Sequence, residues 1–153
     1  MVNPKAHRFV HKISPNDSHF AAYCRLRIAL WPDCAGDCLS EALKITGSER
    51  DAAFLALTET KEPIGFIEIS LRSCAEGATI SPVPYIEGWF VESNHRRQGV
   101  GRALVKAAEQ WATEQGFREI ASDTQLENIG SIAAHLHLGY TEVERNVCFF
   151  KKI

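Results

Sequence analysis

The 153 residues are enough for one domain built around one hydrophobic core. Apolar residues make up 45% of the chain and charged residues 24%, which is ordinary for a globular protein. The net charge of -2 argues against a nucleic-acid-binding protein, and no apolar run is long enough to cross a bilayer. Charged residues interrupt the N-terminal segment, so it does not resemble a signal peptide. We therefore expect residues 1–153 to form a single cytoplasmic domain that has no nucleic-acid or membrane partner.

The cysteine pattern argues against both disulfides and a metal centre. The number of cysteines is odd, and the N-terminal segment does not resemble an export signal, which together indicate reduced thiols. Cys34 and Cys38 have the spacing of half a zinc site, but no second pair of Cys or His residues follows at ligand spacing. We expect no bound metal.

The first half of the chain is predicted to form a strand, two helices and two further strands. A proline at position 32 should end the first helix, because a residue before proline disfavours the α conformation. In chain order, the expected elements are Arg8–Ile13, a helix capped by Asp17 or Ser18 that runs to about Leu30, Ser40–Ile45, Ala52–Leu57 and Ile64–Leu71.

The second half alternates strands and helices before two closing strands. The expected elements are Tyr85–Val91, a helix from Val100 to just before Gly116, Glu119–Ser122, Asn128–Leu138, Thr141–Val147 and Cys148–Lys151. Ile129, Ile132, Ala133 and Leu136 should form the inward face of the last helix. The pattern predicts an α/β (α+β) fold with an antiparallel first half and a parallel strand pair within 85–123.

A glycine-rich segment lies between a predicted strand and the helix that follows it. Gly99 and Gly101 allow a tight turn and close approach of a ligand to the backbone. The first amides of a helix have no partner inside the helix and lie at its positive end, which favours an anion such as a pyrophosphate. Arg96, Arg97 and Arg102 add positive charge nearby.

Two other interpretations of this segment compete with a coenzyme A site. The glycines could serve an ordinary turn with solvated arginines. A dinucleotide site is also conceivable, because Asp123 ends the next predicted strand as a ribose-binding acid would. However, Leu104 occupies the third glycine position, and a polar loop separates the strand from Gly99.

Several motifs together resemble the GCN5-related N-acetyltransferases, and within them the aminoglycoside 6′-N-acetyltransferases. The segment Arg96-x-x-Gly99-x-Gly101-x-Ala103 resembles the cofactor motif of the superfamily. The more specific motifs are Leu26-Arg27-x-x-Leu30-Trp31-Pro32-Asp33, Glu87-Gly88-x-Phe90-Val91, Ala121-Ser122-Asp123-Thr124 and Gly139-Tyr140-x-Glu142-x-Glu144-Arg145.

This resemblance implies a fold and a cosubstrate. The fold would be that of the superfamily, a mixed central sheet with splayed central strands and flanking helices. The cosubstrate would be acetyl-CoA, with its pantetheine arm along Trp89, Phe90 and Val91. Its pyrophosphate would lie on Gln98, Gly99, Val100, Gly101, Arg102 and Ala103, beside Arg96 and Arg97. Asn128 would contact the pantetheine arm, or would merely cap the helix that follows it.

The resemblance also implies an acceptor site for a cationic amine. Asp123 would bind the amino group and act as general base, because an ammonium must lose a proton before it attacks a thioester. Glu87 would bind a substrate ammonium, since a carboxylate inside an apolar strand is costly unless it is paired or faces a cleft. Trp31, Asp33 and Glu144 would complete the substrate site. The alternatives are a core tryptophan, a salt-bridged Glu87, a turn residue at Asp123 and an exposed charge at Glu144.

His135 falls where many members of the superfamily carry a tyrosine that protonates the leaving thiolate, although a half-buried helix histidine is an equal alternative. We expect direct attack in a ternary complex, because no cysteine or serine lies in a nucleophile motif. The expected function is aminoglycoside 6′-N-acetylation that confers resistance. Alternatives are acetylation of a polyamine or another amino sugar, and non-catalytic binding of CoA or a drug. The resemblance also implies a homodimer.

Overall fold

The computed structural model describes residues 9–153. Arg8, which the sequence prediction includes in the first strand, lies outside the described residues. The strands are β1 (Phe9–Lys12), β2 (Asp51–Leu57), β3 (Pro63–Arg72), β4 (Val83–Val91) and β5 (Ala121–Ser122). The α-helices are α1 (Phe20–Leu30), α2 (Cys38–Thr46), α3 (Val100–Glu114) and α4 (Ile129–His137). Two short 3-10 helices, η1 (Pro32–Cys34) and η2 (Ser93–His95), precede α2 and α3.

The five strands form one mixed sheet in the order β1-β2-β3-β4-β5. Neighbours are antiparallel from β1 to β4. Strands β4 and β5 are parallel, with Tyr85 opposite Ala121 and Ile86 opposite Ser122. The predicted antiparallel first half and the predicted parallel pair are therefore both confirmed.

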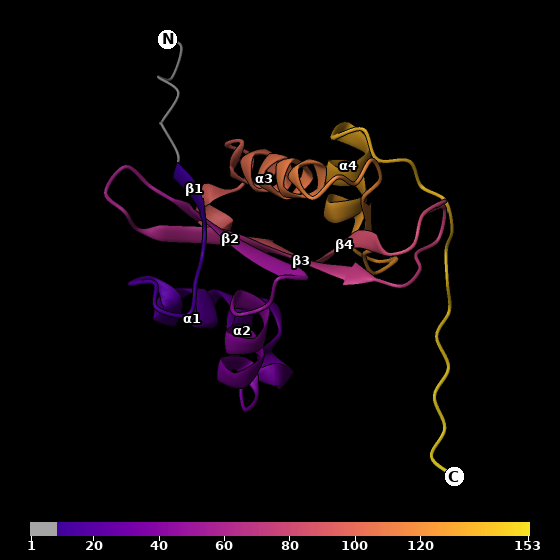
Figure 1. Cartoon of the computed structure of the whole chain (residues 1–153), viewed down its shortest axis with the longest axis horizontal. Coiled ribbons are helices and arrows are strands. Elements are labelled where there is room, and N and C mark those ends of the chain that lie inside the picture. Colours follow the sequence, from indigo (N-terminus) through magenta and orange to yellow (C-terminus); the bar gives the residue numbers. More distant parts are fainter. Residues whose placement is uncertain (1–8) are drawn as a thin grey trace.

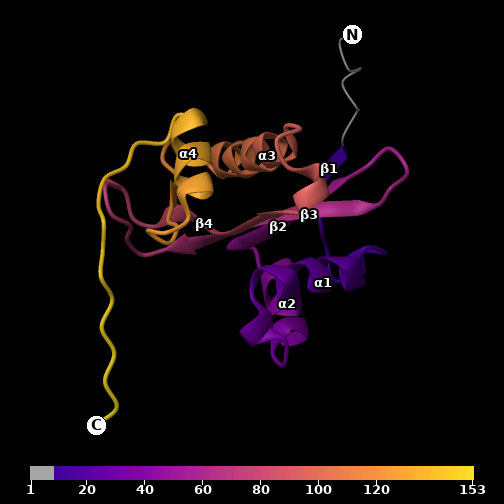
Figure 2. The same ribbon diagram turned by 180° about the vertical axis from the view of Figure 1, so that it is seen from behind.

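Helices cover both faces of the sheet. Helices α1 and α2 lie on one face, and α3 and α4 lie on the other (Figures 1 and 2). The core between α3 and the sheet contains Ile67, Leu104 and Trp111, and the core under α1 contains Tyr23 and Phe66. Within residues 9–153, none of the helices is long and apolar enough to cross a membrane.

The two predicted closing strands are wrong. From residue 141 onward the chain is extended but pairs with no strand in the described part, and it runs away from the sheet (Figures 1 and 2). A strand requires a hydrogen-bonding neighbour, and this segment has none within residues 9–153. The predicted inward face of the last helix is also wrong in part, since Ile129, Ala133 and Leu136 on α4 are exposed.

The helix ends lie where local sequence signals predict them, except for the N-terminal cap of α1. Gly116 and Gly139 have φ of 88° and 95° and end α3 and α4, as predicted. Asn128 caps α4, because its Oδ1 accepts a hydrogen bond from the amide of Ser131 at 3.0 Å. The N-cap of α1 is His19 instead of Asp17 or Ser18, and Asp17 Oδ1 accepts the His19 amide at 2.8 Å.

A buried ion pair fixes α1 to the sheet. Arg27 Nε donates to Glu68 Oε1 at 2.5 Å, and the Tyr23 hydroxyl donates to the same oxygen at 2.6 Å. The other guanidinium nitrogens donate to the Cys38 carbonyl and to Glu41, so Arg27 also joins α1 to α2. Burial opposes the charge on Arg27, but the facing carboxylate outweighs this effect and raises the pKa of Arg27.

We expect Glu68→Gln to lower the free energy of unfolding by about 3 kcal/mol or more, because it leaves the buried guanidinium without its counter-charge. The matched control is Glu41→Gln, which removes a half-exposed partner of the same arginine and should cost less than about 1 kcal/mol. Urea denaturation followed by circular dichroism measures both. Equal losses in the two variants would contradict this assignment.

Candidate active site

The candidate site lies where the central strands part. Strand β4 pairs with β3 from Val83 to Val91, but it pairs with β5 only at Tyr85 and Ile86. Beyond Ile86, the edge of β4 that faces β5 has no strand partner in the described chain, and Trp89, Phe90 and Val91 lie on this stretch. The sheet therefore has the splayed central strands that the sequence predicts. A free strand edge can pair with an extended ligand that carries amide groups.

Free backbone amides lie beyond the end of β4, at the start of α3. Gly99 is the N-cap of α3 with φ of 86°, and Arg97 has φ of 58°, so the chain turns sharply before the helix. Within residues 9–153, the amides of Gly99, Val100, Gly101 and Arg102 donate to no backbone carbonyl. The amide of Ala103 is not free, because it donates to the Gly99 carbonyl at 3.0 Å. The remaining amides and the helix dipole suit an anion.

The side chains around these amides are partly committed to the protein. Arg96 Nε donates to the Val91 carbonyl at 2.8 Å, and an Arg102 guanidinium nitrogen lies 2.8 Å from His137 Nε2. Gln98 Nε2 donates to the Asn94 carbonyl at 2.9 Å. Arg96, Arg97 and Arg102 are all exposed, so their charges remain available to an anion at the helix start.

A glycine is required at position 101, because α3 packs closely on Trp89 of β4 there. A β-carbon at this position would lie 2.9 Å from Cζ2 of Trp89, closer than real side chains approach each other. The indole Nε1 of Trp89 is buried and donates to no acceptor among the described residues. This orphan donor lies next to Gly101 at the start of α3.

Glu87 lies at a β-bulge near the point where β4 and β5 separate. The register shifts between Glu68 and Ile69, so Glu87 has no direct partner on β3. Arg72 binds its carboxylate through Nε at 2.8 Å and through a second nitrogen at 2.5 Å, and the Ser70 hydroxyl also donates to it. Burial disfavours the ionised form, but these hydrogen bonds outweigh it and lower the pKa of Glu87.

The network continues from Arg72 to Asp123. The Arg72 guanidinium lies 3.6 Å from the centroid of the Tyr85 ring, and the Tyr85 hydroxyl donates to Asp123 Oδ1 at 2.8 Å. Burial and the Asp123 carboxylate raise the pKa of Tyr85, so its hydroxyl remains a donor. Asp123 itself is exposed at the end of β5. Its second oxygen accepts no hydrogen bond from the described residues, so it is available to a cation.

His135 lies on α4, and its ring contacts Ser122 of β5 and Trp89 of β4. Its ring stands edge-on to the rings of Trp89 and Tyr140. Nδ1 lies 2.8 Å from the Ser131 carbonyl, which can only accept, so Nδ1 carries a proton. In the neutral ring, Nε2 then accepts from the Ser122 hydroxyl at 2.8 Å. His135 can therefore release a proton from Nε2 only in its imidazolium form.

The structure does not bring the other predicted substrate residues into this network. Trp31 packs on the backbone of β4, where a β-carbon at Gly88 would lie 2.3 Å from its ring, and it contacts Phe66 edge-on. Asp33 is exposed on η1, and Glu144 is exposed on the C-terminal segment that leaves the body of the protein (Figure 1). Their predicted contacts with substrate remain predictions.

Sequence reasoning missed the residues around Glu87, Asp123 and His135. Ser70 and Arg72 on β3 bind Glu87, Tyr85 on β4 binds Asp123, and Ser122 at the end of β5 bonds His135. The two-residue spacing of Ser70 and Arg72 places them on one face of a strand, and Tyr85 and Glu87 have the same spacing on β4. That alternation was a usable signal, but the pairing between β3 and β4 was needed to bring the two sets together.

Comparison with known proteins identifies similar sequences. Residues 16–140 match the model of the acetyltransferase (GNAT) family. The chain is 42% identical over 150 residues to an aminoglycoside N(6′)-acetyltransferase type 1 of Klebsiella aerogenes, covering 94% of this chain and 96% of that protein. It is 40% identical over 141 residues to the protein of the same name from Stenotrophomonas maltophilia, covering 92% and 90%.

Solved structures of similar proteins share this fold. One is AAC(6′)-Iy in complex with a bisubstrate analogue, CoA-S-monomethyl-acetylneamine. It is 33% identical with a TM-score of 0.89, over 96% of this chain and 99% of that chain. Another is the aminoglycoside 6′-N-acetyltransferase AAC(6′)-Ih from Acinetobacter baumannii. It is 36% identical with a TM-score of 0.86, over 96% and 99% of the two chains.

Proposed function

The chain belongs to the acetyltransferase (GNAT) family, and from this premise we propose that it transfers the acetyl group of acetyl-CoA to the 6′-amine of aminoglycosides. The observation that carries the proposal is the opening between β4 and β5. Free amides of α3 lie beyond the end of β4, and the exposed carboxylate of Asp123 lies where the strands part. The similar sequences and structures act on aminoglycosides, which supports this acceptor and a role in resistance.

The amides of Gly99–Arg102 would hold the pyrophosphate, with the exposed arginines around it. Trp89, Phe90 and Val91 would pair with the pantetheine arm. The side-chain nitrogen of Asn128 would add a donor, because its Oδ1 already accepts the Ser131 amide in the helix cap. Acetyl-CoA supplies the activated acetyl group.

Asp123 would bind the substrate ammonium through its free oxygen, while Tyr85 fixes the other oxygen. The carboxylate takes one proton from the ammonium, and the amine nitrogen attacks the thioester carbon. The carbon–sulfur bond then breaks, the nitrogen releases its second proton to water, and the sulfur gains a proton. His135 in its imidazolium form is the proposed donor of that last proton. Glu87 can bind a second ammonium only if Arg72 releases it.

We also propose that residues 1–153 act as one domain, in the cytoplasm and as a homodimer, without a nucleic-acid or membrane partner. The support for a dimer is the segment after Tyr140, which is extended and leaves the body of the protein. Phe149 and Phe150 on this segment are 93% and 87% exposed. A second copy of the chain would give this segment the strand neighbour it lacks within residues 9–153.

An acetylation assay with a panel of amines tests the proposed activity. We expect thiol release from acetyl-CoA with kanamycin and tobramycin, and mass spectrometry should place the acetyl group on the 6′-amine. Spermidine and a peptide amine should be far poorer substrates. Preference for spermidine would indicate a polyamine acetyltransferase, and CoA binding without turnover on any amine would indicate a binding module.

We expect Asp123→Asn to lower kcat by about 100-fold or more, because the base is lost, while acetyl-CoA affinity stays unchanged. Tyr85→Phe should cause a smaller loss, since it only frees the carboxylate to rotate. Glu127→Gln, an exposed acid in the same loop, is the control and should be neutral. Steady-state kinetics and calorimetric titration measure the two effects, and equal loss of turnover and cofactor affinity would point to a structural role.

Gly101→Glu should abolish acetyl-CoA binding, because its side chain collides with Trp89 and brings negative charge to the helix start. Since this variant could also disturb packing, Arg97→Glu provides a second test at an exposed position. We expect it to weaken acetyl-CoA binding by roughly tenfold or more, whereas Arg118→Glu, beyond the far end of α3, should bind normally. Unchanged affinity in Arg97→Glu, measured calorimetrically, would contradict the placement of the pyrophosphate.

A further inference from the structure

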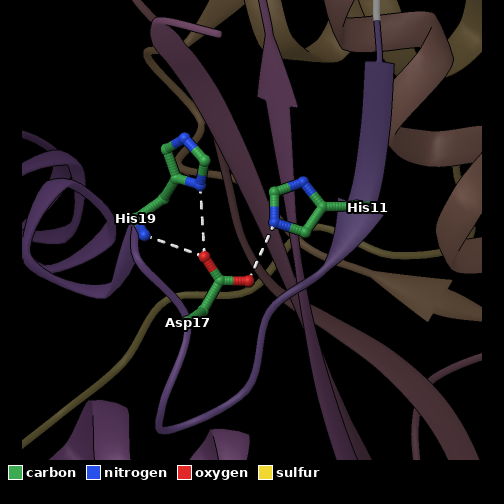
Figure 3. A group of neighbouring side chains, drawn as sticks. All are labelled: His11, Asp17 and His19. Atoms are coloured by element: carbon green, nitrogen blue, oxygen red, sulfur yellow. Dashed lines mark hydrogen bonds and ion pairs between the residues drawn. The ribbon is translucent and has the colours of Figure 1, made fainter.

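Three potential metal ligands converge between β1 and the start of α1, and none of them takes part in the proposed acetyl transfer. His11 lies on β1, and Asp17 and His19 lie on the loop that leads to α1 (Figure 3). His11 Nε2 is 3.0 Å from Asp17 Oδ2, and His19 Nδ1 is 3.2 Å from Asp17 Oδ1. The three ligand atoms lie within 4.8 Å of one another.

These distances suit a small transition-metal ion. Ligands bound to zinc at about 2.0–2.2 Å in tetrahedral geometry lie about 3.3–3.5 Å apart. The two distances to Asp17 join different oxygens of its carboxylate and are close to that spacing, so a small rearrangement of the three side chains would admit the ion. Two imidazole nitrogens and one carboxylate oxygen form a ligand set that suits zinc and other first-row divalent metals rather than Ca²⁺ or Mg²⁺.

The cluster is also held in place before any ion arrives. The His19 amide donates to Asp17 Oδ1 at 2.8 Å, which fixes the carboxylate. The two imidazole rings stand 5.6 Å apart between centroids at 60°, with both of the named nitrogens turned toward the carboxylate (Figure 3). The side chains of His11, Asp17 and His19 are 34%, 16% and 26% exposed, so solvent can reach the cluster.

The neighbouring charge is compatible with a cation. The surface depression beside the cluster is lined by Phe9, Leu57 and Lys61. Lys61 is the cationic side chain that lines it within the described residues, and its ammonium lies over the Phe9 ring at 4.5 Å from the centroid. This contact with an aromatic face provides the ammonium with a partner outside the cluster.

We propose that His11 Nε2, His19 Nδ1 and the Asp17 carboxylate bind one divalent transition-metal ion such as Zn²⁺. At least one coordination position stays open to water, because the chain supplies three ligands. The ion would tie β1 to the start of α1 and so stabilise the folded state. The sequence-based expectation of no metal considered cysteine spacing and did not consider this histidine-aspartate combination.

Titration of the untagged full-length chain, freed of metal with a chelator, tests the proposal. We expect calorimetry to show one Zn²⁺ per chain and the midpoint of thermal unfolding to rise with added Zn²⁺. His11→Ala and His19→Ala should each weaken Zn²⁺ binding by about tenfold or more, and Asp17→Asn should also weaken it. His137→Ala removes an exposed histidine elsewhere and should bind Zn²⁺ like the unmodified chain.

Two further measurements separate metal binding at this cluster from unfolding of the variants and from metal binding by cysteine. Thermal unfolding of the metal-free variants shows whether they fold, so that loss of binding is not loss of structure. Co²⁺ absorption before and after alkylation of the exposed thiols shows whether Cys34, Cys74 or Cys148 supplies ligands instead. Absence of Zn²⁺ binding in the unmodified chain would overturn the proposal. Unchanged binding in both histidine variants, or a spectrum that disappears on alkylation, would do the same.

Discussion

Strand β4 must be held firmly on one edge and left free on the other, and the rest of the structure depends on this asymmetry. Pairing with β3 runs from Val83 to Val91 and is interrupted only at the bulge of Glu87, whereas pairing with β5 ends at Ile86. The glycine turn then begins α3 beyond the end of β4, and its first amides donate to no backbone carbonyl in the described chain. The anion site and the free edge are therefore two parts of one extended surface, as a long ligand with a phosphate group and amides requires.

The acceptor end of this surface contains a charge that the resemblance does not imply. Arg72 binds Glu87 through two nitrogens, in the position where the carboxylate would otherwise meet a substrate ammonium. A paired carboxylate gains little from a second cation unless the first one leaves, and separating a half-buried pair costs free energy. Asp123 accepts from the neutral Tyr85 hydroxyl and forms no ion pair among the described residues. In the proposed reaction, recognition of the amine would therefore depend more on Asp123 than on Glu87.

The sequence predicts features whose causes are local. The proline after Trp31, the glycines at 99, 116 and 139 and the cap at Asn128 each act within one turn, and all are found where they were expected. The Arg72–Glu87 pair could not be predicted, because it depends on the register between β3 and β4 and on a bulge. The closing strands failed for a related reason, since their apolar residues are typical of strands but the described chain offers no neighbour.

Helix α1 connects these separate features. At its start lies the His11, Asp17 and His19 cluster, in its middle Arg27 is paired with Glu68 on β3, and just beyond its end Trp31 packs on Gly88 of β4. Gly88 follows Glu87 directly, so α1 packs on the backbone of β4 next to the proposed acceptor carboxylate. A metal ion that restrains the start of α1 would thus act on the same rigid element that supports β4, although it would not contact the substrate. The stability of α1 and the geometry of the acceptor site are therefore expected to be coupled through Arg27 and Trp31.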